Sequence, residues 1–441
     1  MAESVERSWA RLGRRLEQFF PVGVMVDDGE DTETHAVKER GTVVAAVTPT
    51  PDRQGVAIDW RGRRRIFRHG DNAPFLDSEV AVVECTLSFL ERHFGEESAL
   101  SAEVAEDEDL PDDTIVANYL GAPEPRRLVA ALAVLRAAAL STYENRQLST
   151  GALLLGTEDG SEGGPTLPAY DIRLSGVKGF HRLCDGVHSL FLVGLDGRLR
   201  HAVDVERWAD EHGGGLAIGP CPRAYAPHAR ATAQGGHTAL VLMPSHEIKV
   251  FHGGHFACAF SVARWRILDI PTKARLWSEA VTDARVATYL FEAALDMSES
   301  RHGALFVVLD DAASVDALVA PSDRLEALQA PTVGGARPLA PRSKLIFANM
   351  MAGVKKVTDL DRSVFESLAS LDGAIVLDRE GNLLSFGAIL RVPPEAALPE
   401  RNPDGARTTI ALIAAQYAAV LKVSEDGVLT MYHRGRRVWD V

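Results

Sequence analysis

Cysteine is scarce in this chain of 441 residues, which carries four of them, and no two lie close together in the sequence. We therefore expect Cys85, Cys184, Cys221 and Cys258 to be reduced thiols rather than a disulfide framework. Long apolar runs are missing as well, since nowhere do about 18 apolar residues follow one another. The first twenty residues contain acidic side chains and have no apolar core of signal-peptide length. A cytoplasmic protein that does not enter a membrane is expected.

The sequence signatures of several large enzyme classes are also missing. It contains no GxxxxGK[ST] loop, no GxSxG elbow and no HExxH helix, which excludes the common NTPase, hydrolase and zincin interpretations. Positive charge is in deficit, with 47 basic against 61 acidic residues and a formal net charge of -14. That balance disfavours a general DNA-binding or acidic-membrane surface but leaves room for a local pocket for a small phosphorylated ligand.

The length predicts two or three domains, each with its own core. Residues 1–120 are expected to form an N-terminal α+β module of unknown role. It begins with an amphipathic helix from Ser4 to Phe20, continues with strands between His35 and Phe67, and includes a helix from Ser78 to Phe94.

A β-hairpin is predicted from Leu371 to Leu390, and the rest of the chain is organised around it. Two apolar runs of strand character flank a polar turn, and an Asp-Gly pair precedes the first run. Asp372 thus stands at a strand entrance, beside a glycine that permits close approach of another backbone or a ligand. An Asp-Gly before a strand is more often a plain turn, so its flanks decide the interpretation.

The flanking segments follow a recognisable order. Gly303 opens a buried strand upstream of the hairpin; downstream, a helix begins at Gly405, and a strand from Ala418 to Val423 ends at Ser424. This order, over roughly residues 280 to 435, resembles the diadenylate cyclase domain, the family that joins two ATP molecules into the second messenger cyclic di-AMP. The resemblance implies an α/β fold with a mixed β-sheet flanked by helices.

The pattern occurs twice. A helical run from Pro125 leads into a strand whose Gly151-Ala152-Leu153 matches Gly303-Ala304-Leu305. A hairpin then follows His188, a helix start contains Arg230, and a strand follows from Thr238. We infer an internal duplication, with a degenerate cyclase-like lobe at residues 126–265 and a diadenylate-cyclase-like nucleotide-binding lobe at residues 275–441. Because His188 stands in the first lobe where Asp372 stands in the second, we expect the first lobe to be inactive.

The resemblance also implies a site in the second lobe. Asp372 would be the catalytic carboxylate and the ligand of Mg²⁺ or Mn²⁺. The other residues that match the family's nucleotide-binding motifs are Gly373, Ala374, Gly387, Gly405, Arg407, Thr408, Thr409, Ser424 and Glu425. The implied partners are ATP or a related nucleotide and a second copy of the chain, because one active lobe per chain requires a homo-oligomer formed through the C-terminal lobe.

The phosphate motif departs from the family pattern. The family has Arg-His-Arg at the helix start, whereas this chain has Arg407-Thr408-Thr409. Neutral hydroxyl donors bind phosphate less strongly than charged ones. Two functions therefore remain open: a nucleotidyltransferase that makes cyclic di-AMP, or a catalytically inactive sensor of a nucleotide or cyclic dinucleotide that uses the same pocket. A purely structural scaffold is a third, weaker option.

Overall fold

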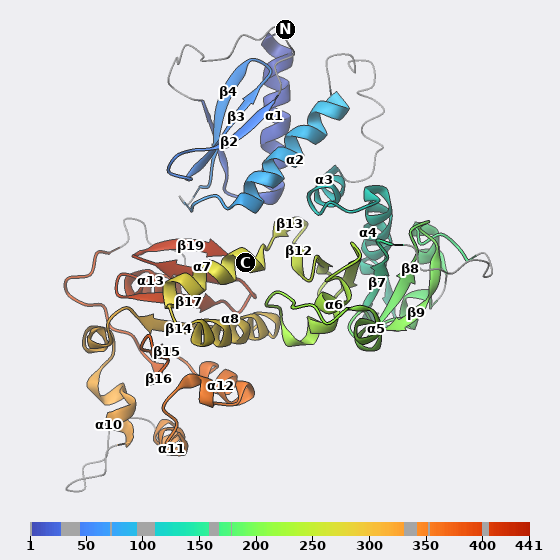
Figure 1. The fold of residues 1–441 in the computed structure, drawn as a ribbon. Helices are drawn as coiled ribbons and strands as arrows, with labels where there is room; N and C mark the ends of the chain where they lie inside the picture. The colour runs from blue at the N-terminus through green and yellow to red at the C-terminus, as the bar shows by residue number, and fades with distance from the viewer. Residues whose placement is uncertain are drawn as a thin grey trace, which may run out of the picture. The chain divides into compact units, whose positions relative to one another are not determined.

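The computed structural model describes residues 2–27, 45–70, 73–94, 111–157, 167–177, 179–329, 342–351, 353–398 and 405–441. The chain divides into two compact units (Figure 1). Unit one comprises Met1–Gly219 and Tyr225–Asp269, and unit two comprises Pro220–Ala224 and Ile270–Val441.

Unit one begins with an α+β module. Its antiparallel sheet has the strand order β1-β4-β3-β2. The elements are α1 (Ala2–Phe19), β1 (Val24–Asp27), β2 (Ala46–Pro49), β3 (Gly55–Trp60), β4 (Arg63–Arg68), α2 (Asp77–Phe94) and α3 (Pro111–Tyr119). The apolar stripe predicted for the first helix is confirmed, because Trp9, Leu12 and Leu16 are fully buried. The Trp9 ring meets Trp60 of β3 edge-on, with centroids 5.6 Å apart.

The rest of unit one is built on a seven-stranded sheet of order β13-β12-β11-β10-β7-β8-β9. The strands are β7 (Thr150–Leu154), β8 (Ser189–Val193), β9 (Leu199–Asp204), β10 (Thr238–Leu242), β11 (Ile248–His252), β12 (His255–Ser261) and β13 (Arg264–Ile267). The helices are α4 (Pro125–Ala139), α5 (Val205–His212) and α6 (Ala226–Ala231), and a short hairpin pairs β5 (Thr142–Tyr143) with β6 (Arg146–Gln147).

Unit two contains a six-stranded sheet of order β16-β15-β14-β17-β18-β19. The strands are β14 (Ala304–Leu309), β15 (Ala374–Leu377), β16 (Leu383–Ala388), β17 (Ala418–Val423), β18 (Leu429–His433) and β19 (Arg436–Asp440). The helices are α7 (Ile270–Val281), α8 (Ala284–Glu299), α9 (Val315–Leu318), α10 (Leu325–Gln329), α11 (Arg342–Met350), α12 (Arg362–Ala369) and α13 (Ala406–Ala414). The predicted hairpin is confirmed as the antiparallel pair β15–β16.

The two larger sheets share one topology, so the chain is a duplicated α/β protein with mixed sheets. In each, one inner strand runs parallel to one neighbour and antiparallel to the other: β7 with β8 and β10, and β14 with β15 and β17. The hairpins close alike, through the pairs Val193–Leu199 and Leu377–Leu383. This places His188 at the position of Asp372, as the sequence predicts.

The register corrects one detail of the predicted repeat. Phe306 pairs with Ile375, and Ala152 pairs with Phe191, so these two pairs occupy equivalent positions. Gly151 therefore falls at the position of Leu305 and not of Gly303. Both strands contain the sequence Gly-Ala-Leu, but at positions that differ by two residues in the sheet register, so matching these sequences gave the wrong alignment.

Side chains of β14 alternate between two helical layers. Leu305 and Val307 join Ala411 and Ala414 of α13 in one apolar cluster. Phe306 points the other way and contacts Phe365 of α12, with ring centroids 5.3 Å apart. Since both faces of β14 are buried, its sequence is a continuous apolar run rather than an alternating one. Helices α12 and α13 thus cover opposite faces, which leaves the strand ends as the place for polar groups.

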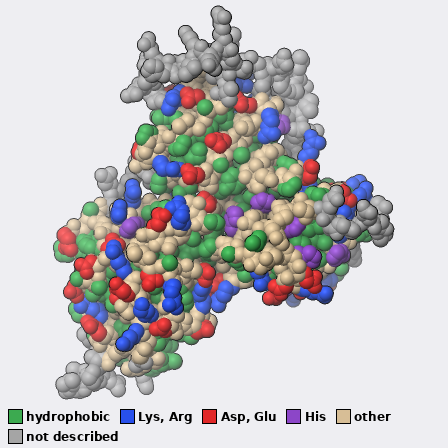
Figure 2. Space-filling view, viewed as in Figure 1, with side chains coloured by type: hydrophobic (Ala, Val, Ile, Leu, Met, Phe, Trp, Pro, Cys, Tyr) green, Lys and Arg blue, Asp and Glu red, His purple; other side chains and the backbone are tan. Residues whose placement is uncertain are grey.

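The four cysteines are unpaired, and three of them are buried, as expected for reduced core thiols. Among the described helices, none has the length and apolar character needed to cross a membrane. On the face shown in Figure 2, acidic and basic side chains are interspersed over the surface.

A buried histidine gives unit one a dependence on pH. His228 of α6 is fully buried, its Nε2 donates to the Gly186 carbonyl at 2.8 Å, and burial lowers its pKa to about 4. Because the pKa of His228 is lower in the folded than in the unfolded protein, its contribution to the free energy of unfolding is complete above the unfolded pKa of about 6.5. This contribution is lost as the pH falls toward the pKa of the folded state. Lowering the pH from 7 to 5 should therefore reduce the free energy of unfolding by roughly 2 kcal/mol through this one histidine.

Hydrogen exchange of β7 and β10 peptides at both pH values, corrected for the chemical exchange rate, checks this expectation. His228→Gln should lower the protection at pH 7 but flatten its decline toward pH 5. An equally steep decline in the variant would show that His228 is not the titrating group.

Candidate functional site

Sheet register brings the predicted site residues to one edge of the six-stranded sheet. Since β14 and β15 are parallel, their first residues lie at the same edge, and continuing their register back by three residues sets Asp372 beside Gly303. Antiparallel β17 ends at this edge, because Val423 pairs with Ala304. The return strand β16 also ends there, with Ala388 opposite Ala374. Residues distant in sequence thus meet at what we call the Gly303 edge, defined by Gly303, Asp372, Gly387, Arg407 and Glu425.

Asp372 presents an available carboxylate. The residue is exposed and lies two positions before β15. Within the described part of the chain its carboxylate makes no hydrogen bond or ion pair. Asp378, at the other end of the strand, behaves differently: its carboxylate accepts hydrogen bonds from the backbone and side-chain nitrogens of Asn382. Asp378 is therefore occupied in the hairpin turn, whereas Asp372 can bind a ligand.

The two glycines of the hairpin serve its backbone. Gly373 has a φ of +110°, and a Cβ there would lie 2.5 Å from the carbonyl carbon of Gly387. Gly387 has a φ of +53° and approaches the Asp372 carbonyl oxygen, which a Cβ would meet at 3.2 Å. These two glycines thus allow the backbones of the two hairpin strands to approach each other closely. This approach fixes the path of the backbone at Asp372.

Arg407 lies over the bare Cα of Gly303. A Cβ on Gly303 would lie 2.3 Å from Nη1 of Arg407 and 3.2 Å from Cγ of Glu425. The guanidinium is about one-third exposed, and its Nη1 lies 3.7 Å from Oε1 of Glu425, whose side chain is largely exposed. Such a partly solvated ion pair is weak, so a ligand anion can replace the carboxylate at little cost.

The start of α13 carries a positive charge that the sequence analysis missed. Lys422 of β17 donates from Nζ to the Thr408 hydroxyl oxygen at 2.9 Å. Burial lowers the pKa of Lys422, Asp426 raises it, and Arg407 lowers it further. The charge expected to be missing from Arg407-Thr408-Thr409 is thus partly restored from the neighbouring strand. A lone lysine inside the apolar run of β17 was the available signal.

Gly405 and Thr409 are joined within the first turn of α13. Gly405 has a φ of +94° at the N-cap position, and its carbonyl accepts from the backbone nitrogens of Thr408 and Thr409. The Thr409 hydroxyl donates to the same carbonyl at 3.3 Å. Thr409 is thus committed to its own helix, whereas Thr408 holds the Lys422 amine.

Ser424 and Glu425 lie in a tight turn. The Ser424 nitrogen donates to the Val428 carbonyl, and the Ser424 carbonyl accepts from Gly427. The turn and a site role are compatible, because the turn carries Glu425 toward Arg407.

Lys344 of α11 is a further residue that sequence reasoning missed. Its amine donates to the Gly387 carbonyl and the Asp323 carboxylate, both at 2.9 Å, which ties α11 to the hairpin.

The equivalent edge of the first sheet is differently equipped. Asp185 accepts backbone hydrogen bonds from Val187, His188 and Ser189, and one from the His188 ring. Burial opposes its ionisation, but these hydrogen bonds hold the pKa of Asp185 well below its usual range. Its carboxylate is therefore saturated by its own loop. Arg230 lies 3.4 Å from the Asp210 carboxylate.

The Gly303 edge offers oxygen ligands of the kind that Mg²⁺ and Mn²⁺ prefer. Within the described residues, no three acidic, histidine or cysteine side chains converge as a metal cage. Magnesium commonly uses only one or two protein carboxylates and takes its other ligands from substrate phosphates and water. The exposed, unengaged carboxylate of Asp372 fits such a role.

Comparisons with known proteins found only distant structural neighbours of part of the chain. No protein-family model matches the chain, and no curated protein matches it. A hypothetical membrane spanning protein from Bacillus cereus is 20% identical over 38% of this chain and 71% of that one, with a TM-score of 0.25. A double mutant of DacA from Staphylococcus aureus is 14% identical over 36% of this chain and 89% of that one, with a TM-score of 0.23.

Proposed function

We propose that the Gly303 edge binds ATP with a divalent cation and that the protein condenses two ATP molecules into cyclic di-AMP. The observation that carries the proposal is the convergence of an unengaged carboxylate, Asp372, with two cationic side chains, Arg407 and Lys422, at one sheet edge beside a helix start. Phosphate binding at helix N-termini is a general property of their free N–H groups and dipole.

The reaction requires two equivalent substitutions at phosphorus. In each, the 3′-oxygen of one ATP attacks the α-phosphate of the other, the 3′-proton is released, and the bond to pyrophosphate breaks, so two ATP give cyclic di-AMP and two pyrophosphates. Arg407 and Lys422 would orient the phosphates and stabilise the developing negative charge. A cation held by Asp372 would neutralise phosphate charge near the attacking oxygen.

The reaction requires two ATP-binding sites that face each other. The first lobe has His188 in place of Asp372, so the second site has to come from another chain. We therefore propose a homodimer, or a larger assembly, in which two Gly303 edges meet across the bound nucleotides.

A sensor that binds a nucleotide without chemistry is the second candidate. It is favoured by the occupied groups at the phosphate motif: the Thr409 hydroxyl donates to the Gly405 carbonyl, and Arg407 has a carboxylate partner in Glu425. Both functions use the same edge, and they differ in whether a product forms.

Incubation of the purified protein with ATP and Mn²⁺, with GTP in parallel, followed by mass spectrometry, separates the two candidates. A cyclic di-AMP peak that grows with time is the result we expect. Saturable nucleotide binding by calorimetry without any cyclic product would establish the sensor instead, and absence of both would remove the proposed site.

Gly303 provides a test of how Arg407 is positioned. A methyl group at residue 303 would displace the end of a flexible side chain, so Gly303→Ala should leave stability nearly unchanged. Loss of one charged phosphate contact should weaken ATP binding by roughly tenfold or more in calorimetry. The double variant Gly303→Ala/Arg407→Ala should bind no more weakly than Arg407→Ala alone. Additive losses would mean that Gly303 acts by another route.

A further inference from the structure

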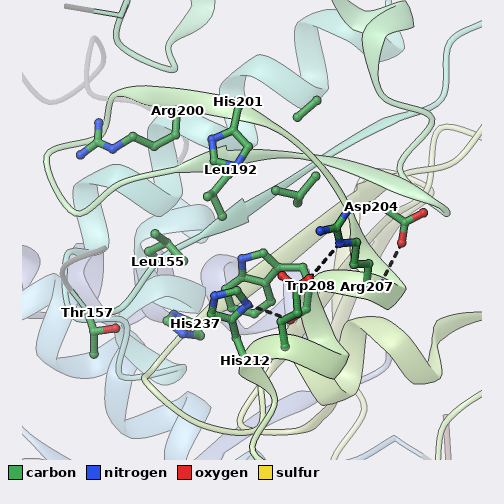
Figure 3. A pocket seen from close by; sticks show the side chains of 13 residues that line it. Leu155, Thr157, Leu192, Arg200, His201, Asp204, Arg207, Trp208, His212 and His237 are labelled. Atoms are coloured by element: carbon green, nitrogen blue, oxygen red, sulfur yellow. Dashed lines mark hydrogen bonds and ion pairs between the residues drawn. The ribbon is translucent and has the colours of Figure 1, made fainter. Parts of the chain in front are cut away.

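A cavity lies in the first lobe, and none of its lining residues belongs to the Gly303 edge. It measures about 600 Å³, within the range of small-molecule sites, and lies between the β9 hairpin and α5 (Figure 3). Leu155, at the end of β7, and Leu192 of β8 line it together with Arg200 to Asp204 of β9. Helix α5, which directly follows β9, forms part of the cavity wall. In the second lobe, the corresponding residues 389–398 after β16 contain no helix, so this wall is a feature of the first lobe.

One wall of this cavity is aromatic. Trp208 of α5 stacks on His212, with centroids 4.6 Å apart and the planes 16° from parallel. His237 meets Trp208 edge-on at 5.3 Å. Figure 3 shows these three rings gathered on one side, with Leu155 and Leu192 nearby. A cluster of rings beside aliphatic side chains favours a flat aromatic ligand, which gains both area burial and ring contacts.

His237 is held in one protonation state. Its Nδ1 accepts the Gly156 backbone N–H at 2.9 Å, so Nε2 carries the proton. Burial lowers the pKa of His237 to about 4, so the ring is neutral at physiological pH. It thus offers a fixed polar contact without adding a buried charge.

One arginine of the lining supplies exchangeable positive charge. Arg207 bonds Glu211 at 2.8 Å, and its side chain is 80% exposed. Arg200 is also ion-paired, 3.1 Å from Asp196, but its side chain is only 21% exposed. A solvated pair such as Arg207–Glu211 contributes little, so an anionic ligand group can take the place of the Glu211 carboxylate. Although three histidines and two acidic residues line the cavity, the described residues include no cluster able to hold a metal ion, which favours an organic ligand.

We propose that the cavity between β9 and α5 is a binding site for a small planar aromatic anion, in which the ring packs against Trp208 and the anionic group is held by Arg207. The anionic group can be a phosphate, as in a nucleoside monophosphate, or a carboxylate on an aromatic ring. The site is independent of the proposed reaction, because none of its residues belongs to the Gly303 edge.

Calorimetric titration of the full chain with adenosine 5′-monophosphate and, separately, indole-3-acetate tests this site and tells the two kinds of anion apart. The Arg407→Ala variant is used as background so that binding at the Gly303 edge is suppressed. Submillimolar binding of at least one probe is expected. Arg207→Gln should weaken it at least fivefold and, because the Arg207 side chain is largely exposed, should leave the fold intact. Trp208→Leu should weaken it at least tenfold.

Arg173→Gln is the matched control, because Arg173 is also an exposed, ion-paired arginine of unit one but lies outside the cavity. It should bind like the parent. No binding of either probe at millimolar concentration, or binding that survives both Arg207→Gln and Trp208→Leu, would overturn the proposal. Neither outcome bears on cyclic di-AMP synthesis, which is measured by its product.

Discussion

Replacement of Asp372 by asparagine is expected to abolish cyclic di-AMP formation while leaving the fold intact. The side chain is exposed and has no partner among the described residues, so its charge contributes little to packing. Metal-assisted charge neutralisation contributes several kcal/mol to a transition state, which corresponds to a loss of roughly a hundredfold or more. The initial rate of product formation by mass spectrometry, at saturating Mn²⁺, measures the effect.

Glu380→Gln is the control for this change. Glu380 is an exposed acid of the same hairpin but lies in its turn, at the opposite end of β15. It should retain the rate of the unmodified protein. If Asp372→Asn kept its activity, the catalytic role of Asp372 would be wrong; if both variants lost activity equally, a general effect of charge would explain the loss.

Gly373→Ala is expected to destabilise unit two strongly. The new Cβ would lie 2.5 Å from the Gly387 carbonyl carbon and 2.7 Å from the nitrogen and oxygen of Ala388, all of them backbone atoms that cannot rotate away. A φ of +110° adds strain for any residue with a Cβ. Together these should cost about 3 kcal/mol, so hydrogen exchange in β15 and β16 should accelerate roughly a hundredfold.

Gly353→Ala separates the two contributions. Gly353 has a φ of +98°, but a Cβ there would meet nothing within 4 Å. This variant should therefore show the backbone strain alone, about 1 kcal/mol. Equal effects of the two substitutions would contradict the contact between the strands of the hairpin.

Local sequence patterns predicted the parts of the fold that depend on periodicity and turn chemistry. The β15–β16 hairpin could be located because two apolar runs flank a turn that ends in Gly381 and Asn382. The duplication could be inferred because the same order of elements recurs. In the repeat, however, the shared Gly-Ala-Leu sequence placed Gly151 two residues away from its true equivalent. The alignment of the two lobes follows from the pairing of β7 with β8, which the sequence does not contain.

Contacts between distant segments could not be predicted. That Lys422 reaches Thr408 depends on how α13 crosses β17, which no local pattern contains. Gly303 was recognised as a strand start, but its role in making room for Arg407 emerges only when β14, α13 and the turn after β17 are assembled. The cavity beside Trp208 was missed for the same reason, since its lining comes from four separate segments.

Mapping where ATP contacts the chain tests the central claim most directly. Photolabelling with 8-azido-ATP in the presence of Mn²⁺, followed by peptide mass spectrometry, would locate the bound nucleotide. We predict adducts within residues 301–310, 371–390 or 405–426, all suppressed by excess ATP and reduced in Arg407→Ala. Labelling confined to other segments, or labelling that Arg407→Ala leaves unchanged, would contradict a nucleotide site at the Gly303 edge.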